Sequence, residues 1–435
     1  MIFVDDVAYV WWYDNEGAIQ SYGINFIEDL PHFLVLLLCF DRFSAKDWGI
    51  VSEFTERAAG DCVLSIRDPS CPDSTFTIDI NQTKKIRGHF GIVGRATQML
   101  SASSQSTILG RQGESKKPRD LKDMELVLKV YWPEESRINE ADIIDEADRI
   151  AERNSHVKGH LPDLIWARDL DEYSTKNIRM AFGIKSESPR VLRVMLFRRF
   201  YPITDLTGDR FWKAFWQCFR CKFTWSIRCQ RLSDADALVV LGHYHLWHGG
   251  VEHSDISVSN LMYDKDNEDC GILNDFDLAH RRGRPRPSGT ERTGTMPFMA
   301  LDLLTKDAWD GKVRRLYRHD CESFAWVLLW ICCRYEDGKE IHEAPLSKLI
   351  TDDFEVCYAE KLAYHRGLAA TTSYEPYWRA VMDLVNWSLY RHLKAEHNQT
   401  SREPAAPEEE PTIHEVIEIY RNILEKRGFK DLSEL

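Results

Sequence analysis

Three carboxylates and an amide stand close together in two short, largely apolar stretches of the sequence. The first stretch, Val251–Tyr263 (VEHSDISVSNLMY), contains Asp255 and Asn260, and the second, GILNDFDLA, contains Asp275 and Asp277. One carboxylate can accept the proton of a hydroxyl group, while another carboxylate and the amide hold Mg²⁺ against a nucleotide. These residue types therefore suit phosphoryl transfer.

The composition indicates a folded chain with room for more than one compact part. The sequence has 435 residues, of which 43% are hydrophobic, with 14 Trp, 16 Tyr and 20 Phe. This is enough for two or three domains or for one large two-lobed domain. The net charge of −13 argues against nucleic acid or an anionic membrane as the main partner.

Several features predict an intracellular protein, cytoplasmic or nuclear. The 11 cysteines are irregularly spaced and two of them, Cys332 and Cys333, are adjacent, which is typical of reduced thiols and not of a disulfide framework. The opening MIFVDDVAYVWWYD has neither the basic region nor the apolar core of a signal peptide. The longest apolar run, Phe33–Phe40, is too short to span a bilayer. We therefore expect no signal peptide and no transmembrane segment.

Strand signals dominate the first half of the chain. Tyr9–Tyr13 and Ala18–Ile27 flank a turn and predict a hairpin, and the mostly apolar Leu30–Phe40 predicts a buried helix. The polar, turn-rich stretch Ser101–Asp120 predicts a mobile insertion. Further strands are predicted at Thr75–Ile80, Glu125–Tyr131 and Arg190–Pro202, with a helix at Arg137–Arg153.

Helix signals dominate the second half of the chain. Helices are predicted at Phe211–Phe223, Ser233–Trp247, Asp320–Arg334, Tyr377–Leu393 and Thr412–Arg427, and the acidic, proline-rich Glu396–Thr412 predicts a loop. This order predicts an α+β fold with a small β-rich lobe and a larger helical lobe. The expected division is an N-terminal extension at 1–75, a β-rich lobe at 76–202 and a helical lobe at 203–435.

A lysine on a predicted strand is the next group that could take part in chemistry. Lys129 shares one face of Glu125–Tyr131 with Val127. On the helix that follows, Glu140 lies on the inward apolar face, and Glu146 lies to the side of it. A cation held rigid by a carboxylate suits phosphate binding. Glu140 is the favoured partner of this lysine, and Glu146 is the alternative.

Six motifs follow one another in order along the chain. They are WWYD, the GRAT turn, the K-x-x-W strand end, H-x-D-I-S-x-x-N, D-F-D-L-A and T-G-T-x-x-F-M-A. Together they resemble the fungal-type protein kinase domain family, a branch of the protein kinase superfamily. The resemblance implies a two-lobed protein kinase-like fold. It also implies an enzyme that uses ATP and Mg²⁺ and transfers the γ-phosphate to Ser/Thr hydroxyl groups of a protein substrate.

The resemblance also implies roles for single residues in catalysis and metal binding. Asp255 is similar to the catalytic aspartate, which orients the substrate hydroxyl and takes its proton. Thr295, in GTMPFMALD, resembles the threonine that hydrogen-bonds this aspartate and is typical of Ser/Thr-directed enzymes. Asn260 and Asp275 resemble the two Mg²⁺ ligands.

A further set of residues resembles the nucleotide site. Lys129 is similar to the strand lysine that grips the α- and β-phosphates, with Glu140 as its helix partner. The bend flanked by Gly91 and Gly94 is expected to position phosphates. The stretch around Phe197–Tyr201 is expected to be the hinge that faces adenine. The predicted nucleotide-binding residues are Gly91, Gly94, Val127, Lys129, Phe197, Arg198, Phe200 and Tyr201.

Some positions resemble supporting residues of the family and others depart from its pattern. Asp302 stands where A-P-E has Glu and can still hold an arginine, and Asp320 resembles the helix aspartate that ties down the catalytic loop, with a helix cap as the alternative. Ser254 and Ser257 stand where Ser/Thr kinases have Arg and Lys, and Asp277 replaces the glycine of D-F-G. No part of the chain matches G-x-G-x-x-G in full.

Two patterns allow interpretations that the resemblance to protein kinases does not include. Cys218 and Cys221, with Cys229 and the histidines 243, 245 and 248, could indicate zinc, but a second C-x-x-C is missing and the cysteines lie in an aromatic amphipathic pattern typical of a core. The basic run His280–Pro287 is compatible with binding an acidic substrate or a phosphate, or with a solvated loop.

Two other functions compete with the protein kinase hypothesis. A pseudokinase or interaction scaffold would fit the departures at Ser254 and Asp277. A small-molecule kinase of the aminoglycoside or choline type would share H-x-D-x-x-x-x-N and a metal-binding Asp, but it would lack the peptide-substrate feature GTMPFMA.

Overall fold

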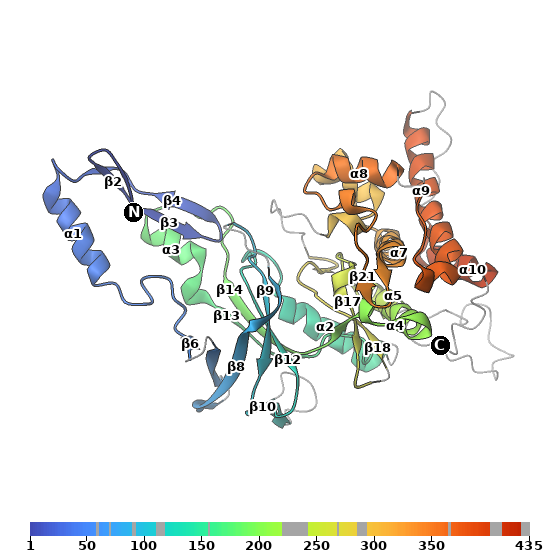
Figure 1. Cartoon of the computed structure of the whole chain (residues 1–435), viewed down its shortest axis with the longest axis horizontal. Coiled ribbons are helices and arrows are strands. Elements are labelled where there is room, and N and C mark those ends of the chain that lie inside the picture. The colour runs from blue at the N-terminus through green and yellow to red at the C-terminus, as the bar shows by residue number, and fades with distance from the viewer. Residues whose placement is uncertain are drawn as a thin grey trace. The chain divides into compact units, whose positions relative to one another are not determined.

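The chain forms two compact units. The computed structural model describes residues 1–57, 61–68, 71–88, 93–109, 118–154, 157–219, 242–267, 269–284, 294–363, 367–400 and 411–427 (Figure 1). The first, β-rich unit comprises residues 1–141 and 163–199, and the second, helical unit comprises residues 142–162 and 200–435. The last boundary between the two units along the chain therefore falls between Arg199 and Phe200, inside the stretch that the sequence predicts to be a hinge.

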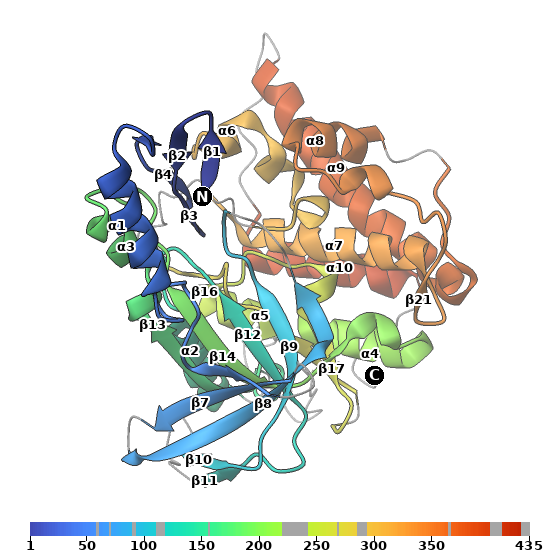
Figure 2. The same ribbon diagram turned by 60° about the vertical axis from the view of Figure 1, so that its left-hand side comes forward.

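A seven-stranded antiparallel sheet forms the centre of the β-rich unit (Figure 2). Its strand order is β13-β14-β12-β9-β8-β7-β6. The strands are β6 (Phe54–Glu56), β7 (Cys62–Asp68), β8 (Cys71–Gly88), β9 (Gln98–Ser103), β12 (Leu126–Tyr131), β13 (Leu164–Leu170) and β14 (Leu192–Arg198). Strand β12 lies between β9 and β14, so both of its edges are hydrogen-bonded.

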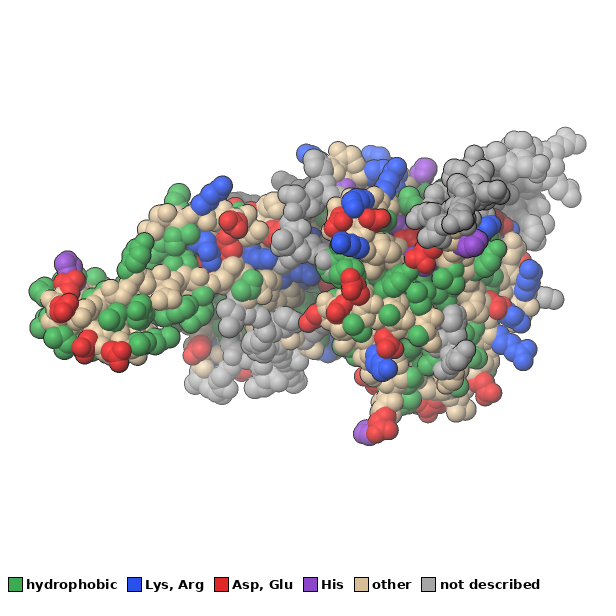
Figure 3. Space-filling model, turned by 90° about the horizontal axis from the view of Figure 1, so that it is seen from above, with side chains coloured by type: hydrophobic (Ala, Val, Ile, Leu, Met, Phe, Trp, Pro, Cys, Tyr) green, Lys and Arg blue, Asp and Glu red, His purple; other side chains and the backbone are tan. Residues whose placement is uncertain are grey.

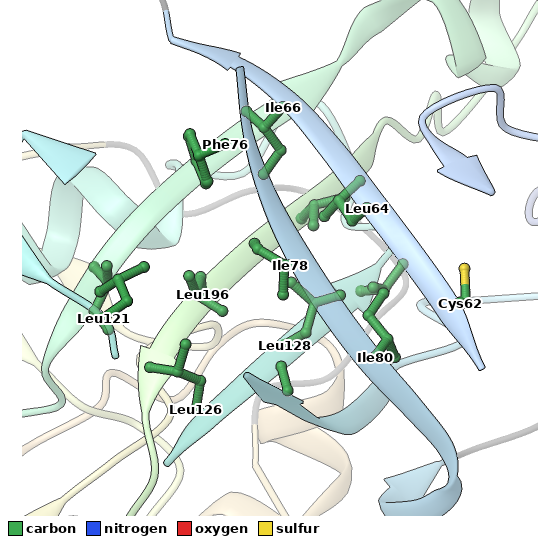
Figure 4. Close-up of a cluster of buried hydrophobic side chains, with 14 of the residues drawn as sticks. Cys62, Leu64, Ile66, Phe76, Ile78, Ile80, Leu121, Leu126, Leu128 and Leu196 are labelled. Atoms are coloured by element: carbon green, nitrogen blue, oxygen red, sulfur yellow. The ribbon is translucent and has the colours of Figure 1, made fainter. Parts of the chain in front are cut away.

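One face of this sheet carries the hydrophobic core of the unit. Leu126 and Leu128 of β12 meet Leu64, Ile78 and other aliphatic side chains there (Figure 4). Because side chains alternate along a strand, Lys129 lies on the opposite face. That face is covered as well, since all six residues of β12 are buried. The strand therefore holds a lysine in a closed environment.

The N-terminal segment contains the predicted hairpin. Strands β3 (Trp11–Asp14) and β4 (Gly17–Gln20) pair with Trp12 opposite Ile19, which confirms that prediction. The Asp14 side chain accepts hydrogen bonds from the amides of Glu16 and Gly17 and so closes the turn. A second small sheet contains β1 (Ile2–Val4), β2 (Val7–Tyr9) and β5 (Ile24–Asn25).

The helix predicted at Leu30–Phe40 is present as α1 (Leu30–Asp41), but the prediction that it is buried is wrong. None of its residues is buried, and Leu34 and Val35 are 54% and 58% exposed. Hydrophobic side chains are accordingly visible on the surface of the N-terminal segment (Figure 3, left end). The helix is apolar on every side, and the small sheet beside it offers only a few contacts, such as that between Phe26 and Phe33.

The insertion predicted at Ser101–Asp120 is partly regular. Strand β9 extends to Ser103, and β10 (Thr107–Leu109) pairs with β11 (Pro118–Asp120). Ile108 is 5% exposed and belongs to the core of the sheet. The prediction of a mobile insertion is therefore wrong for these ends, because an apolar residue anchors them; residues 110–117 lie outside the described part.

The helical unit has a core of long helices and aromatic side chains. Phe324 of α7 contacts Phe215 and Phe219 of α4, and Phe219 stacks on Tyr420 of α10. The main helices are α4 (Gly208–Phe219), α5 (Gly242–His248), α7 (Tyr317–Arg334), α8 (Phe354–Ala363), α9 (Trp378–Thr400) and α10 (Ile413–Lys426), while α2 (Glu140–Arg153) begins in the β-rich unit. Almost every residue of α7 is buried, which explains why its second half, Phe324–Cys333, is apolar without a polar face.

The helix boundaries differ from prediction at several ends. Helix α7 begins at Tyr317 and not at Asp320. Helix α9 extends to Thr400, into the stretch Glu396–Thr412 that was predicted to be a loop; residues 401–410 lie outside the description. The predicted helix at Ser233–Trp247 is described only from Gly242. No helix of the described residues is long and apolar enough to cross a membrane.

Candidate active site

A short hairpin in the helical unit brings Asn260 next to Asp275. Strand β17 (Leu261–Asp264) pairs with β18 (Cys270–Leu273), with Leu261 opposite Leu273. Asn260 and Asn274 therefore flank the open end, where the Asn274 amide donates to the Asn260 carbonyl at 2.8 Å. Asp275 follows directly, with φ of 64°, a backbone conformation that Asp tolerates better than most residues. Two predicted metal ligands thus come from the two sides of one hairpin.

Asp255 is held in a fixed orientation by two other predicted site residues. One carboxylate oxygen accepts hydrogen bonds from the backbone amide and the hydroxyl of Thr295, each at 2.8 Å. The other oxygen accepts from Nδ2 of Asn260 at 3.0 Å, and this nitrogen also donates to the Asp255 carbonyl at 2.8 Å. The carboxylate is only partly buried. Both carboxylate oxygens are therefore held in place, while the residue as a whole stays partly exposed.

His253 joins the loop of Asp255 to the loop of Asp275. The Asp255 amide donates to Nδ1 at 3.4 Å, and Nε2 donates to the Asn274 carbonyl at 3.0 Å. The ring contacts Phe276, with centroids 4.8 Å apart. Burial lowers the pKa of His253 to about 4. A neutral imidazole fits both contacts, because one nitrogen must accept while the other donates.

Asp320 fixes the backbone immediately before Asp255. Its carboxylate is fully buried and accepts from the Ser254 amide at 3.3 Å, from Nε2 of His243 at 3.0 Å and from Arg315 at 2.9 and 3.1 Å. Burial alone would raise the pKa of Asp320, but Arg315 and His243 hold it well below its usual range. Ser254 itself has φ of 68°, so the carboxylate stabilises a strained turn.

Sequence reasoning missed two of these residues. The sequence pattern offers His243 as a zinc ligand and gives no role to Arg315. Their contacts with Asp320 span sequence separations of 77 and 5 residues. The run RRLYRHD, with three arginines shortly before a helix carboxylate, is the local signal that could have pointed to Arg315.

Asp302 anchors the end of the Thr295 segment. Its carboxylate contacts Arg318 at 2.5 Å, His319 at 3.3 Å and His392 at 2.6 Å. Burial would raise the pKa of Asp302, but the hydrogen bonds from the two histidines and the charge of Arg318 hold it well below its usual range. The prediction that this aspartate can hold an arginine is confirmed.

The β-rich unit holds a buried ion pair. Nζ of Lys129 lies 2.8 Å from Oε2 of Glu140, and their side chains are 4% and 1% exposed. The hydroxyl of Tyr131 donates to the same oxygen at 2.8 Å, a partner that sequence reasoning missed. The alternative partner, Glu146, instead lies beside Arg149 and Arg281 in the helical unit.

The predicted nucleotide-binding residues are divided between the two units. Val127 pairs with Phe197 across β12 and β14, and the Arg198 amide donates to the Asp163 carbonyl at 3.0 Å. Phe200 and Tyr201 begin the second part of the helical unit, where Tyr201 pairs with Tyr263.

The predicted phosphate-binding bend is only partly described. Gly91 lies outside the described residues. The Gly94 amide donates to the Asn15 carbonyl at 2.9 Å, so in this conformation it cannot also bind a phosphate.

Two departures from the family pattern are accommodated locally. Ser257 is fully buried, and its hydroxyl lies 3.1 Å from that of Ser259. Asp277 is buried and is not among the described residues with positive φ. This position therefore does not need the freedom of glycine.

The zinc interpretation has little support among the described residues. Cys221 and Cys229 lie outside the description, and Cys218 is a buried thiol whose sulfur faces the Met262 carbonyl. His243 is engaged by Asp320 at 3.0 Å. No group of three or more His, Cys, Asp or Glu side chains in the described ranges could hold a metal ion.

Comparison with known proteins identifies the family of the chain. The model of a family described as fungal protein kinase matches residues 1–185 and 232–332. The chain belongs to this family. The family resemblance and the two-lobed α+β kinase-like fold predicted from the sequence are thereby confirmed. The match includes the predicted N-terminal extension.

Two further comparisons were made. No curated protein matches the chain. Among solved structures, that of vaccinia related kinase 3 is similar with a TM-score of 0.42 and 9% sequence identity, over 83% of this chain and 90% of that chain.

Proposed function

We propose that this member of the fungal protein kinase family transfers the γ-phosphate of ATP to Ser or Thr hydroxyl groups of proteins, with Mg²⁺ as cofactor. The observation that carries the proposal is the setting of Asp255, whose carboxylate is oriented by Thr295 and Asn260 and whose residue stays partly exposed. A carboxylate held in this way is suited to orient a hydroxyl group.

Asp255 is the proposed proton acceptor. The substrate hydroxyl oxygen forms a bond to the terminal phosphorus of ATP while the bond from that phosphorus to the bridging oxygen breaks. The hydroxyl proton goes to the carboxylate, and ADP leaves. Because Thr295 engages one carboxylate oxygen with two hydrogen bonds, we assign the proton to the other oxygen, which accepts a hydrogen bond from the Asn260 amide.

Asn260 and Asp275 are the proposed Mg²⁺ ligands. The Asn260 nitrogen faces two acceptors of Asp255, so the amide oxygen points away from them. This oxygen accepts a hydrogen bond from the Ser259 hydroxyl at 3.2 Å, and its second lone pair is proposed to bind the cation. One carboxylate and one amide oxygen suit Mg²⁺, which usually keeps few protein ligands and completes its shell with substrate phosphates and water. When bound, the cation would offset the negative charge of the phosphates.

Lys129 is the proposed phosphate-binding cation. Its pairing with Glu140 fixes the ammonium group inside the β-rich unit, as a rigid cation site requires. Val127 and Phe197 on neighbouring strands, with Arg198, Phe200 and Tyr201, are proposed to contribute to adenine binding. Gly91 and Gly94 remain predicted phosphate contacts, and the second would need to exchange its hydrogen bond with Asn15.

A protein substrate is favoured over a small molecule by the segment around Thr295. The residues after it form a 3₁₀ turn, Met296–Phe298, that is anchored through Asp302 and through a contact of the buried Lys361 ammonium with the Met299 carbonyl. A firmly held segment next to the proton acceptor is suited to position a peptide.

The decisive experiment compares the wild type with Asp255→Asn in a radiolabelled transfer assay with generic acceptor proteins. We expect the variant to lose transfer by about 10²–10⁴-fold, the usual contribution of general base catalysis, and to keep its thermal shift with Mg-ATP. Asp352→Asn, at an exposed aspartate of the helical unit, is the matched control and should keep full transfer. Full activity of Asp255→Asn would refute the proposal. A wild type without transfer or nucleotide-induced shift would favour an interaction scaffold.

A further inference from the structure

A pocket lined by several arginines lies within the helical unit, outside the residues proposed for catalysis. Its volume is about 210 Å³. Four of its eleven lining residues are arginines, namely Arg282, Arg314, Arg315 and Arg318, and Glu252 is its single lining carboxylate. A water molecule occupies about 30 Å³ of the liquid, so the pocket has room for a phosphoryl group.

Three of the four guanidinium groups are held in place by carboxylates. Arg315 is bonded to Asp320, and Arg318 to Asp302. Arg282 lies 3.3 Å from Glu252 and donates to the Trp247 carbonyl at 2.9 Å. A guanidinium has five N–H donors in a rigid plane, and the Arg282 side chain is 44% exposed, so Arg282 can present donors beyond these two contacts. Such preorganisation lowers the entropy cost of binding an anion.

Arg314 gives the pocket its excess positive charge. Its side chain is exposed and has no ion pair or hydrogen bond with any described residue. The other three arginines are each offset by a carboxylate, so Arg314 leaves the lining with a net positive charge. An exposed, unpaired arginine at the rim is suited to complete the coordination of an oxyanion.

The N-terminus of α7 adds to the positive electrostatic potential of the pocket. Leu316 and Tyr317, the N-cap and first residue of this 18-residue helix, line the pocket with Arg318. A leucine side chain has no acceptor for the first N–H groups of the helix, which carry a partial positive charge. A bound anion would supply that acceptor.

We propose that this pocket binds a phosphoryl oxyanion, either inorganic phosphate or a phosphorylated side chain. Planar guanidinium groups make bidentate contacts with phosphate oxygens, and several converging arginines favour a dianion over a single carboxylate. The site lies next to the proposed catalytic loop, because Arg315 and the Ser254 amide bind the same Asp320 carboxylate. It does not depend on phosphoryl transfer, so binding at this site and catalysis can fail separately.

The test is isothermal titration calorimetry of the full chain with inorganic phosphate and with the amidated tripeptide Gly-phosphoserine-Gly. We expect Arg314→Gln and Arg282→Gln each to weaken binding by about tenfold or more, the change expected when a charge-assisted hydrogen bond is lost. The matched control is Arg379→Gln, which removes an exposed arginine of α9 outside the pocket and should leave binding unchanged. Tighter binding of the tripeptide would identify a phosphorylated side chain as the ligand, and equal binding would identify free phosphate.

Three results would overturn the proposal. The first is no binding of either probe to the wild type at millimolar concentration. The second is unchanged binding in Arg314→Gln, because phosphate held elsewhere, including at the nucleotide site, would not respond to this substitution. The third is an equal loss in Arg379→Gln, which would indicate diffuse charge attraction. Arg314 is exposed, so its variant should fold, and an unchanged thermal unfolding midpoint would verify this.

Discussion

Removing either partner of the buried Lys129–Glu140 pair should destabilise the β-rich unit, with opposite pH dependence for the two partners. The two charged atoms lie 2.8 Å apart, with both side chains almost fully buried. Loss of one partner leaves the other charge inside the protein, a change that usually costs about 3–5 kcal/mol.

The largest expected loss of stability in each variant is the free energy needed to neutralise the remaining buried charge by gaining or losing a proton. In Lys129→Met, Glu140 can take up a proton, which at pH 7 costs about 3.7 kcal/mol for a carboxyl that titrates near 4.3 when exposed. Tyr131 still donates a hydrogen bond to it, so the loss should be somewhat smaller. In Glu140→Leu, Lys129 can lose its proton at a cost of about 4.6 kcal/mol at pH 7, since an exposed lysine titrates near 10.4.

These free energies of neutralisation change with pH in opposite directions in the two single variants. Protonating a lone glutamate costs only about 1 kcal/mol at pH 5, so the Lys129→Met variant should recover toward the wild type in acid. Deprotonating a lone lysine costs about 2.6 kcal/mol at pH 8.5, so Glu140→Leu should recover in base. The double variant buries no charge and should lose less stability than either single variant at every pH.

The assay is urea unfolding at pH 5, 7 and 8.5, followed by tryptophan fluorescence. Arg149→Met is the matched control, because it breaks an ion pair with Glu146 in which the arginine is 51% exposed; its loss should stay below about 1 kcal/mol. Equal, pH-independent losses in the two single variants would refute the reasoning, as would a double variant whose loss equals their sum.

Three further predictions concern the helical unit. Burial lowers the pKa of His253 to about 4. The protein should therefore lose about 3 kcal/mol of stability as the pH falls from about 6.5 to 4, because in that range the unfolded state binds the proton more readily than the folded state. In urea unfolding, His253→Gln should show a smaller loss of stability in acid. Gly271→Ala would place Cβ 2.0 Å from the Ala214 carbonyl and should destabilise the unit by about 3 kcal/mol or more, measured as a lower unfolding midpoint; an unchanged midpoint would contradict this packing. Thr295→Ala should lower kcat/KM about tenfold or more by removing a hydrogen bond to Asp255, while Thr295→Ser should retain most activity; equal losses in both would argue against the hydroxyl contact.

The local pattern of the sequence was sufficient for the elements that carry the site. The alternation of Glu125–Tyr131 predicted β12 and the face of Lys129, and the apolar periodicity of the next helix favoured Glu140, which the structure pairs with that lysine. Asp255, Asn260, Asp275 and Thr295 stand in the order of the family motifs, and the structure brings Thr295 and Asn260 to Asp255. These inferences succeeded because side-chain periodicity and motif spacing are properties of short segments.

Other features depend on contacts between distant segments, which only the tertiary structure decided. The apolar pattern of α1 predicted burial, yet hydrophobicity alone cannot specify that a partner surface is present, and the helix is exposed. The same limit applies to His243, which reaches Asp320 across 77 residues, and to Arg282 and Arg314, which converge on one pocket from separate segments. The sequence by itself determined the family, the fold class and the candidate proton acceptor. Tertiary packing decided how Asp255 is held and where the arginines meet, because burial and long-range hydrogen bonds exist only once the chain has folded.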